Sequence, residues 1–211
     1  MKQIELVSFD AEGTLVTPDF SETIWREAIP ALYAEKQGID FAHAQKRITD
    51  EYGRIGDQRL EWYDIEYWFE RLDLGSSRPV VQSCIPKISY YAETKNVLSS
   101  LAGEYRLIVA SGTPIELLHL LLRDITGYFV RVFSSVSHYR GLKSPDFYLG
   151  ICEEMGVDPG RVVHVGDNLQ FDFLNARRAG IEAFYLDRSG KNNGDALSDL
   201  TELQRLLIRA T

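Results

Sequence analysis

Ile4-Glu5-Leu6-Val7-Ser8-Phe9-Asp10-Ala11-Glu12-Gly13-Thr14-Leu15-Val16 decides the fold of this chain. Its branched and aromatic residues lead directly to two carboxylates and a glycine, which predicts a buried strand that ends at a functional site. Ligands of open parallel sheets bind beyond the carboxyl ends of the strands, so we expect Asp10 and Glu12 to face the substrate and Gly13 to allow a tight turn there. Burying two carboxylates together is costly unless a cation neutralises them or one carries a proton. The stretch therefore predicts a metal ion or a protonated acid.

Composition is that of an ordinary globular protein. The chain has 211 residues, of which 45% are hydrophobic and 26% charged, enough for one buried core and a modest insertion. Its net charge of -8 provides no electrostatic attraction for nucleic acid or an anionic membrane. We therefore expect neither as a partner, and an anionic substrate would need local cations or a metal.

The termini and cysteines indicate a cytoplasmic protein. No apolar run approaches the roughly 20 residues that a membrane-spanning helix needs, and Glu5 and Asp10 lie where a signal peptide would be apolar. Cys84 and Cys152 have apolar, helix-like surroundings and no metal-ligand spacing. Both are interpreted as buried, reduced thiols.

Residues 18–90 are predicted to form a separate helical unit. Ser21 is the expected N-cap of its first helix, Pro30 should bend that helix, Asp40 should cap a second, and Pro79 suits the first turn of a fourth. The apolar residues of these helices recur at helical spacing: Trp25, Ile29, Leu32 and Tyr33; Phe41, Ala44, Ile48, Tyr52 and Ile55; Ile65, Trp68, Phe69 and Leu72; Val81, Cys84, Ile85 and Ile88.

From Glu93 onward helices and strands alternate, which is typical of a doubly wound parallel sheet. Strands are expected at residues 105–110, 130–133, 161–165 and 181–186, and helices at 97–101, 114–122, 145–155, 171–179 and 197–207, with a polar loop at 188–195. The predicted fold class is α/β, with a Rossmann-like core of residues 1–17 and 91–211 and a small helical cap of residues 18–90.

Four short motifs carry a resemblance to a known family. Phe9–Leu15 resembles the first motif of the haloacid dehalogenase superfamily, Asp-x-Asp-x-Thr, except that Glu12 stands where the second Asp is usual. Ser111-Gly112 follows an apolar strand and is similar to the second motif, and Lys143 before a helix start is similar to the third. Gly166-Asp167, with Asp172 shortly after it, resembles the fourth.

The resemblance implies a magnesium-dependent phosphatase that acts on a small phosphorylated metabolite. It assigns the side chains of Asp10 and Asp167 and the backbone carbonyl of Glu12 as Mg²⁺ ligands, with Asp172 supporting the site from behind. Asp10 would attack phosphorus and form an aspartyl-phosphate. Ser111, Gly112 and Lys143 would bind the phosphoryl group, and Lys143 would also keep Asp10 ionised. The general acid and base would be Glu12, whose carboxyl group extends one methylene beyond that of Asp.

Two alternatives remain open. The dehalogenase branch of the superfamily has an Asp-Ala-x-Gly-Thr-Leu motif like residues 10–15, but it works without metal and lacks the acid at Asp167. A regulatory or phosphate-binding protein would keep the pocket and turn over poorly because Glu12 is misplaced.

Substrate choice is expected to depend on the cap, since in the superfamily an insertion after the first motif selects the leaving group. We expect Arg54 and Arg59, in a turn between cap helices, to contact the substrate. The protein is expected to be a monomer or homodimer. His164 is interpreted as a buried core residue, and we assign no role to His43, His119 or His138.

Overall fold

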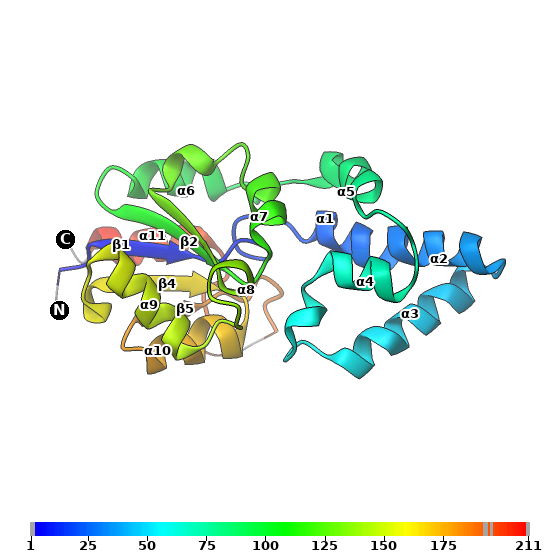
Figure 1. The fold of residues 1–211 in the computed structure, drawn as a ribbon. Helices are drawn as coiled ribbons and strands as arrows, with labels where there is room; N and C mark the ends of the chain where they lie inside the picture. The colour runs from blue at the N-terminus through cyan, green and yellow to red at the C-terminus, as the bar shows by residue number, and fades with distance from the viewer. Residues whose placement is uncertain (1–2, 192–193, 195, 210–211) are drawn as a thin grey trace. The chain divides into compact units, whose positions relative to one another are not determined.

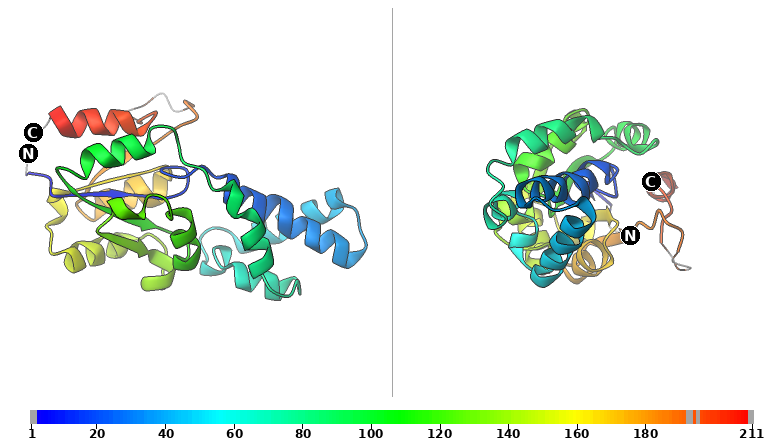
Figure 2. Two further views of the ribbon diagram at one scale, coloured as in Figure 1. Left: turned by 90° about the horizontal axis from the view of Figure 1, so that it is seen from above. Right: turned by 90° about the vertical axis from the view of Figure 1, so that its right-hand side faces the viewer.

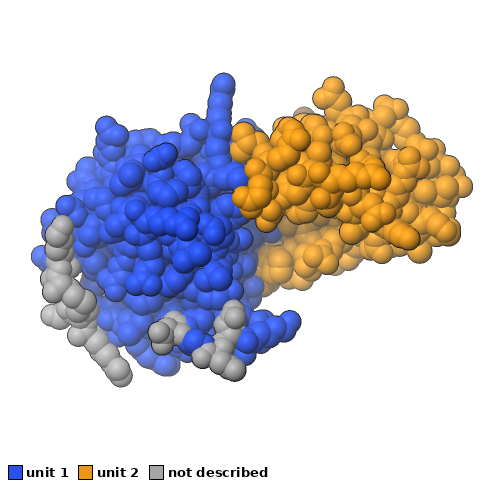
Figure 3. Space-filling view, turned by 90° about the horizontal axis from the view of Figure 1, so that it is seen from below, with its two compact units in different colours: residues 1–16, 90–211 blue, residues 17–89 orange. Residues whose placement is uncertain are grey.

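The computed structural model describes residues 3–191, 194 and 196–209 (Figure 1). The chain packs into two compact units, residues 1–16 with 90–211 and residues 17–89 (Figure 3). The crossing points lie one residue before the predicted ones. Backbone hydrogen bonds join the two chain segments at these crossing points. Val16 forms a β-bridge with Tyr90, and the N–H of Thr17 donates to the carbonyl of Ser89 at 2.9 Å.

The first unit is built on a five-stranded, wholly parallel sheet in the order β3-β2-β1-β4-β5. Its strands are β1 (Leu6–Phe9), β2 (Arg106–Ser111), β3 (Arg131–Ser134), β4 (Val162–Gly166) and β5 (Glu182–Tyr185). β1 lies in the centre, and the crossovers run in opposite directions on its two sides. This arrangement confirms the doubly wound α/β fold that the sequence predicts.

Helices cover both faces of this sheet. α6 (Thr94–Leu101) packs beside α11 (Leu200–Arg209) on one face, and α9 (Pro145–Met155) beside α10 (Asn175–Arg178) on the other (Figure 2). Two short helices, α7 (Ile115–Leu121) and α8 (Ser135–His138), flank β3. All residues of β1 and β4 are buried, as expected for central strands of a parallel sheet covered on both faces.

The second unit consists of helices: α1 (Asp19–Glu22), η1 (Thr23–Ala28), α2 (Ile29–Gln37), α3 (Phe41–Ile55), η2 (Leu60–Trp62), α4 (Ile65–Arg71), α5 (Arg78–Cys84) and η3 (Ile85–Lys87). Asp40 caps α3 as predicted, because its carboxylate accepts a hydrogen bond from the N–H of His43 at 3.1 Å. Pro30 follows the π-helical turn η1 and has no N–H to donate to the preceding turn. The side-chain amide of Gln45 donates to the carbonyl of Arg26 instead, at 3.0 Å.

Two predicted boundaries in the second unit are wrong. The first helix begins at Asp19 rather than after Ser21, because Pro18 suits a helix start and Thr17 donates a 2.5 Å hydrogen bond to the Asp19 carboxylate. In α5, Val80 is buried where the spacing favoured Val81, because the helix starts one residue earlier than expected.

Three local predictions for the first unit also differ from the structure. The helix expected at 171–179 is a π-helical turn, η6 (Leu169–Leu174), followed by α10; it starts early because Asn168 accepts from the N–H groups of Gln170 and Phe171. α8 was not predicted. α11 starts at Leu200, because Asp199 accepts from the Thr201 N–H at 2.7 Å. The predicted loop 188–195 includes residues 192, 193 and 195, which lie outside the described residues.

Within the described residues, no helix is both long enough and apolar enough to cross a membrane.

Candidate active site

The site lies at the carboxyl edge of the sheet. Asp10 directly follows β1, Ser111 ends β2, and Asp167 directly follows β4. Because these are adjacent parallel strands with Phe9 paired to both Val109 and Val165, their ends meet at one place. The fold thus brings residues more than 100 positions apart in the sequence to one edge.

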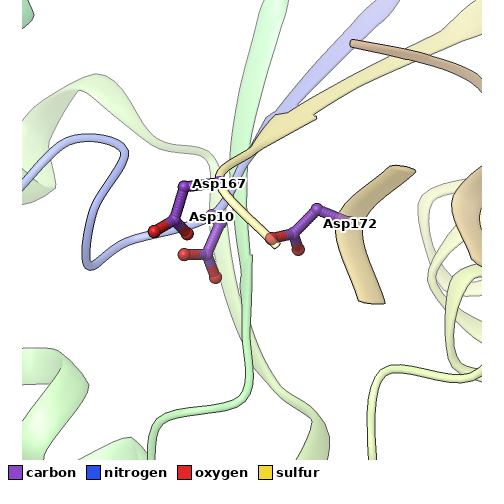
Figure 4. A group of neighbouring side chains, drawn as sticks. All are labelled: Asp10, Asp167 and Asp172. Carbon is purple, nitrogen blue, oxygen red and sulfur yellow. The ribbon is translucent and has the colours of Figure 1, made fainter. Parts of the chain in front are cut away.

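Three carboxylates form a compact group there (Figure 4). Asp10, Asp167 and Asp172 each offer an oxygen within 4.8 Å of the others. Asp10 and Asp172 are buried, whereas Asp167 is exposed. The group contains the side chains of Asp10 and Asp167, the two predicted carboxylate ligands, and also that of Asp172.

Lys143 is the cation of the site. Its ammonium lies 2.7 Å from Asp10 Oδ1, forms an ion pair with Asp172, and is only 6% exposed. The chain around it is fixed, because Ser144 caps α9 by accepting from the Phe147 N–H and Asn175 donates to the Lys143 carbonyl at 2.7 Å. Ser144, between Lys143 and Pro145, is therefore the helix cap.

Charges within the group are unbalanced. Burial raises the pKa of Asp10, and repulsion from Asp172 adds to this rise, while the attraction of Lys143 offsets only part of it. Burial of the carboxyl group, and then the charges of Asp10 and Asp172, raise the pKa of Asp167 to about 7, although the residue as a whole is exposed. Burial would also raise the pKa of Asp172, but Lys143 and His164 lower it, to about 2. Lys143 and His164 thus compensate Asp172, whereas burial leaves the pKa values of Asp10 and Asp167 raised.

Two glycines make room for these carboxylates. Gly13 has a φ of 75°, and a Cβ there would lie 2.0 Å from Asp167 Oδ2. A Cβ on Gly166 would lie 2.3 Å from the Asp172 Cγ. Both contacts are far below normal separation, so any side chain at either position would displace a carboxylate.

The other predicted residues lie as follows. Ser111 is buried, and its hydroxyl accepts from the Thr113 N–H at 3.3 Å, with Gly112 between them. Glu12 is partly buried in the turn after β1, where its backbone pairs with Val16. Arg54 and Arg59 are exposed in the second unit and form ion pairs with Glu51 and Glu61.

Arg188 is a residue of this region that the sequence reasoning missed. It donates to the carbonyls of Gly13 and Thr14 at 3.1 and 2.7 Å, pairs with Glu93 at 2.8 Å, and lies 3.5 Å from the ring centroid of Tyr91. Its position just after the last strand was the available signal, because that strand ends at the same sheet edge. The polar composition of residues 188–195 instead predicted only a loop.

The donor set fits a hard divalent cation. The three carboxylates offer oxygen donors, two of them have raised pKa values, and Gly13 leaves the space that the Asp167 carboxylate occupies. Asp10 and Asp167 gain most from a cation, because burial raises their pKa values, whereas the pKa of Asp172 is lowered.

Comparison with known proteins agrees with this geometry. A family model described as haloacid dehalogenase-like hydrolase matches residues 4–180. The chain belongs to this family. It is therefore a hydrolase of the haloacid dehalogenase type.

Solved structures show how widely the fold is shared. A HAD phosphatase from Thermococcus onnurineus aligns with a TM-score of 0.86 and 25% identity, covering 97% of this hydrolase and 98% of that chain. A 2-haloacid dehalogenase from Pseudomonas syringae pv. Tomato DC3000 aligns with a TM-score of 0.67 and 21% identity, covering 99% and 100%. The second likeness shows the fold alone.

One curated relative is a nucleotidase. GMP/IMP nucleotidase YrfG of Shigella flexneri is 24% identical over 118 residues, which are 55% of this hydrolase and 52% of the relative. The match thus spans about half the length of either protein.

Proposed function

We propose that this hydrolase is a magnesium-dependent phosphatase that acts on small phosphate monoesters through a phosphorylated Asp10. The observation that carries the proposal is the buried Asp10 carboxylate with Lys143 at 2.7 Å and Asp167 beside it. Lys143 holds the nucleophile in one orientation and offsets its negative charge, while Asp167 and Asp10 provide the oxygens that would bind the metal. Mg²⁺, when bound, would neutralise charge on the phosphoryl group.

The protein groups then have separate tasks. Asp10 attacks phosphorus and becomes phosphorylated as the bond from phosphorus to the leaving oxygen breaks, which divides one difficult hydrolysis into two easier steps. Ser111 and the backbone around Gly112 bind phosphoryl oxygens. Glu12 donates a proton to the leaving oxygen and accepts one from the water that hydrolyses the intermediate.

Asp167 favours the phosphatase over the dehalogenase alternative. A dehalogenase displaces halide from carbon and has no need for a second carboxylate, whose charge would repel a carboxylate substrate. In this structure Asp167 lies within reach of Asp10 and needs a cation to ionise fully at neutral pH. Metal binding therefore accounts for a carboxylate at Asp167, whereas dehalogenation does not.

The deciding experiment is hydrolysis of a panel of phosphate esters, including GMP and IMP because of the relative's name, with and without Mg²⁺. We expect chelation, Asp10→Asn and Asp167→Asn each to abolish turnover. Asp124→Asn is the matched control, because Asp124 is an exposed carboxylate paired with the adjacent Arg123. Phosphatase activity of Asp10→Asn near the parental rate would exclude the covalent mechanism. A well-folded parent that binds phosphate but hydrolyses no ester would support the regulatory alternative.

We also propose that the second unit serves as a cap that selects the leaving group. Arg54 and Arg59 are exposed cations on it, available to an anionic or polar substrate. Replacing both by Ala should raise KM for the best panel substrate by about tenfold or more and leave kcat within about threefold. Arg47→Ala is the control, since Arg47 lies over the Tyr33 ring of the same unit. An unchanged KM would remove Arg54 and Arg59 from substrate recognition.

A further inference from the structure

A chain of buried polar groups runs behind the carboxylates, and the proposed mechanism does not use it. His164 is fully buried in β4, directly beside Ser8 of β1 in the sheet register. Its Nδ1 lies 2.8 Å from Ser8 Oγ, and its Nε2 lies 3.3 Å from Asp172 Oδ1 and 3.1 Å from the Tyr148 hydroxyl. A polar group buried this deeply is retained only if its hydrogen bonds are satisfied.

The partners identify which ring nitrogen carries the proton. The Tyr148 hydroxyl donates to the Phe171 carbonyl at 3.0 Å, so it can only accept from His164. Asp172 is a carboxylate and can also only accept. Both therefore require a proton on Nε2, and Nδ1 can then accept from the Ser8 hydroxyl at 2.8 Å. The ring is then neutral, with each nitrogen satisfied.

Asp172 depends on these donors for its orientation. Its Oδ2 accepts from the Asn168 N–H at 2.9 Å, and its Oδ1 faces both His164 and Lys143. The carboxyl group occupies the space that Gly166 leaves beside the strand, because a Cβ there would lie 2.5 Å from Oδ2. Without His164, Oδ1 would lose a donor that holds it on the side of Lys143.

We infer that His164, fixed by Ser8 as the neutral Nε2–H tautomer, is a positioning residue that holds Asp172 so that Lys143 stays against Asp10. The connected groups are Ser8, His164, Asp172, Lys143 and Asp10, which come from β1, β4, η6 and the start of α9. The inference rests on the proposed function for its catalytic consequence but not for the tautomer or the contact with Asp172. Replacing a partner of this kind typically lowers activity or metal affinity by about 10- to 100-fold.

Kinetics with the magnesium-loaded enzyme test the catalytic part. His164→Leu, which keeps an apolar side chain of similar size, should lower kcat about 10- to 100-fold with KM within about threefold. His164→Gln places an amide N–H near the position of Nε2 and should restore kcat to within about threefold of the parent. Val163→Ala is the control for a change in the buried strand, since Val163 is equally buried but lies on the opposite face.

A double variant separates positioning from general destabilisation. If His164 acts through Asp172, the double variant with His164→Leu and Asp172→Asn should have a kcat less than about threefold below that of Asp172→Asn alone. The inference would be overturned if the kcat losses of the two single variants combined fully in the double variant. It would also be overturned if folded His164→Leu, assayed below its melting temperature, had the parental kcat.

Nitrogen NMR of the histidine rings supplies a test that does not depend on activity. The His164 signals should show the neutral Nε2–H tautomer, and Ser8→Ala and Asp172→Asn should each shift them, while Val163→Ala should not. A charged ring, an Nδ1–H tautomer, or signals unmoved by Asp172→Asn would overturn the inference even if the protein proved to have no phosphatase activity. A parent that lacks activity but shows the expected signals would contradict only the proposed function.

Discussion

Glu12 is the residue whose chemistry departs most from the family motif. It carries the expected carboxylic acid on one extra methylene, in the turn directly after Asp10. As the proposed general acid, it should matter most when the leaving group is a poor one. We predict that Glu12→Gln lowers kcat on alkyl phosphates by about 10²-fold or more, and much less on aryl phosphates, whose leaving oxygens need little protonation.

The aryl substrate serves as the internal control for this prediction, because it reports folding, metal binding and nucleophilic attack in the same variant. Glu12→Asp should also lower kcat on alkyl phosphates, because it withdraws the proton by roughly 1 Å from surroundings adapted to Glu. Equal losses on both substrate classes would show that Glu12 contributes binding rather than acid–base catalysis.

Gly13 provides a second residue-scale prediction. Its φ of 75° disfavours any side chain, and a Cβ would lie 2.0 Å from Asp167 Oδ2. Gly13→Ala should therefore cost about 1 kcal/mol in stability and also weaken Mg²⁺ binding by about tenfold or more, measured by calorimetry. Gly156, at the end of α9, has a φ of 62° with nothing within 4 Å of its Cβ position. Gly156→Ala should show the same loss of stability with unchanged Mg²⁺ affinity.

At the scale of elements, the turn after β1 is held in place by a residue from the far end of the sheet. Arg188 follows β5 and binds the carbonyls of Gly13 and Thr14, while its guanidinium also pairs with Glu93. The contact connects the turn that carries Glu12 with the segment that returns from the second unit. We expect it to maintain the geometry of this turn during turnover.

Arg188→Met should lower the free energy of unfolding by about 1–3 kcal/mol, because it leaves Glu93 and two backbone carbonyls without their donor. It should also lower kcat, since the turn beside Asp10 loses its support. Chemical denaturation measures the first effect. Adding Glu93→Gln should recover part of the stability but not kcat. Arg123→Met, which removes an exposed cation, should change stability by less than about 0.5 kcal/mol.

At the scale of the whole molecule, the carboxylate group links stability to pH and to metal. The pKa of Asp10 is raised and that of Asp167 is raised to about 7, so the folded state binds more protons at neutral pH than the unfolded state. Stability from these groups is then present at low pH and is lost as pH rises through about 7. Mg²⁺ relieves the same repulsion.

Mg²⁺ should therefore raise the melting temperature more at pH 8 than at pH 6, where protons compete for Asp167. Thermal unfolding with Mg²⁺ or a chelator measures this difference, and Asp167→Asn should remove most of it. A melting temperature that responds equally to Mg²⁺ at both pH values would show that Asp167 is not a ligand.

The sequence by itself determined the architecture and the chemistry-bearing strand ends. Alternating helices and strands predicted the parallel sheet, because local periodicity reports which face of each element is buried. Asp10 could be identified because it follows an apolar strand, which is a local signal, whereas Lys143, Asp167 and Asp172 were identified through their resemblance to motifs of the haloacid dehalogenase superfamily. Errors occurred where a local signal was overridden, as at residues 171–179, where Asn168 shifts the helix start and the first turn is π-helical.

Only the tertiary structure decided which distant groups touch. Periodicity identified His164 as a buried residue, but it carried no information that Ser8, 156 positions away, would satisfy one ring nitrogen and Asp172 the other. Likewise the place of Arg188 after the last strand indicated the sheet edge but not its partners, which lie up to 175 positions away. Such contacts arise from sheet register and helix packing, which bring together residues that no window of sequence contains. For that reason the sequence could name the carboxylates, while the groups that hold them in place became visible only in the fold.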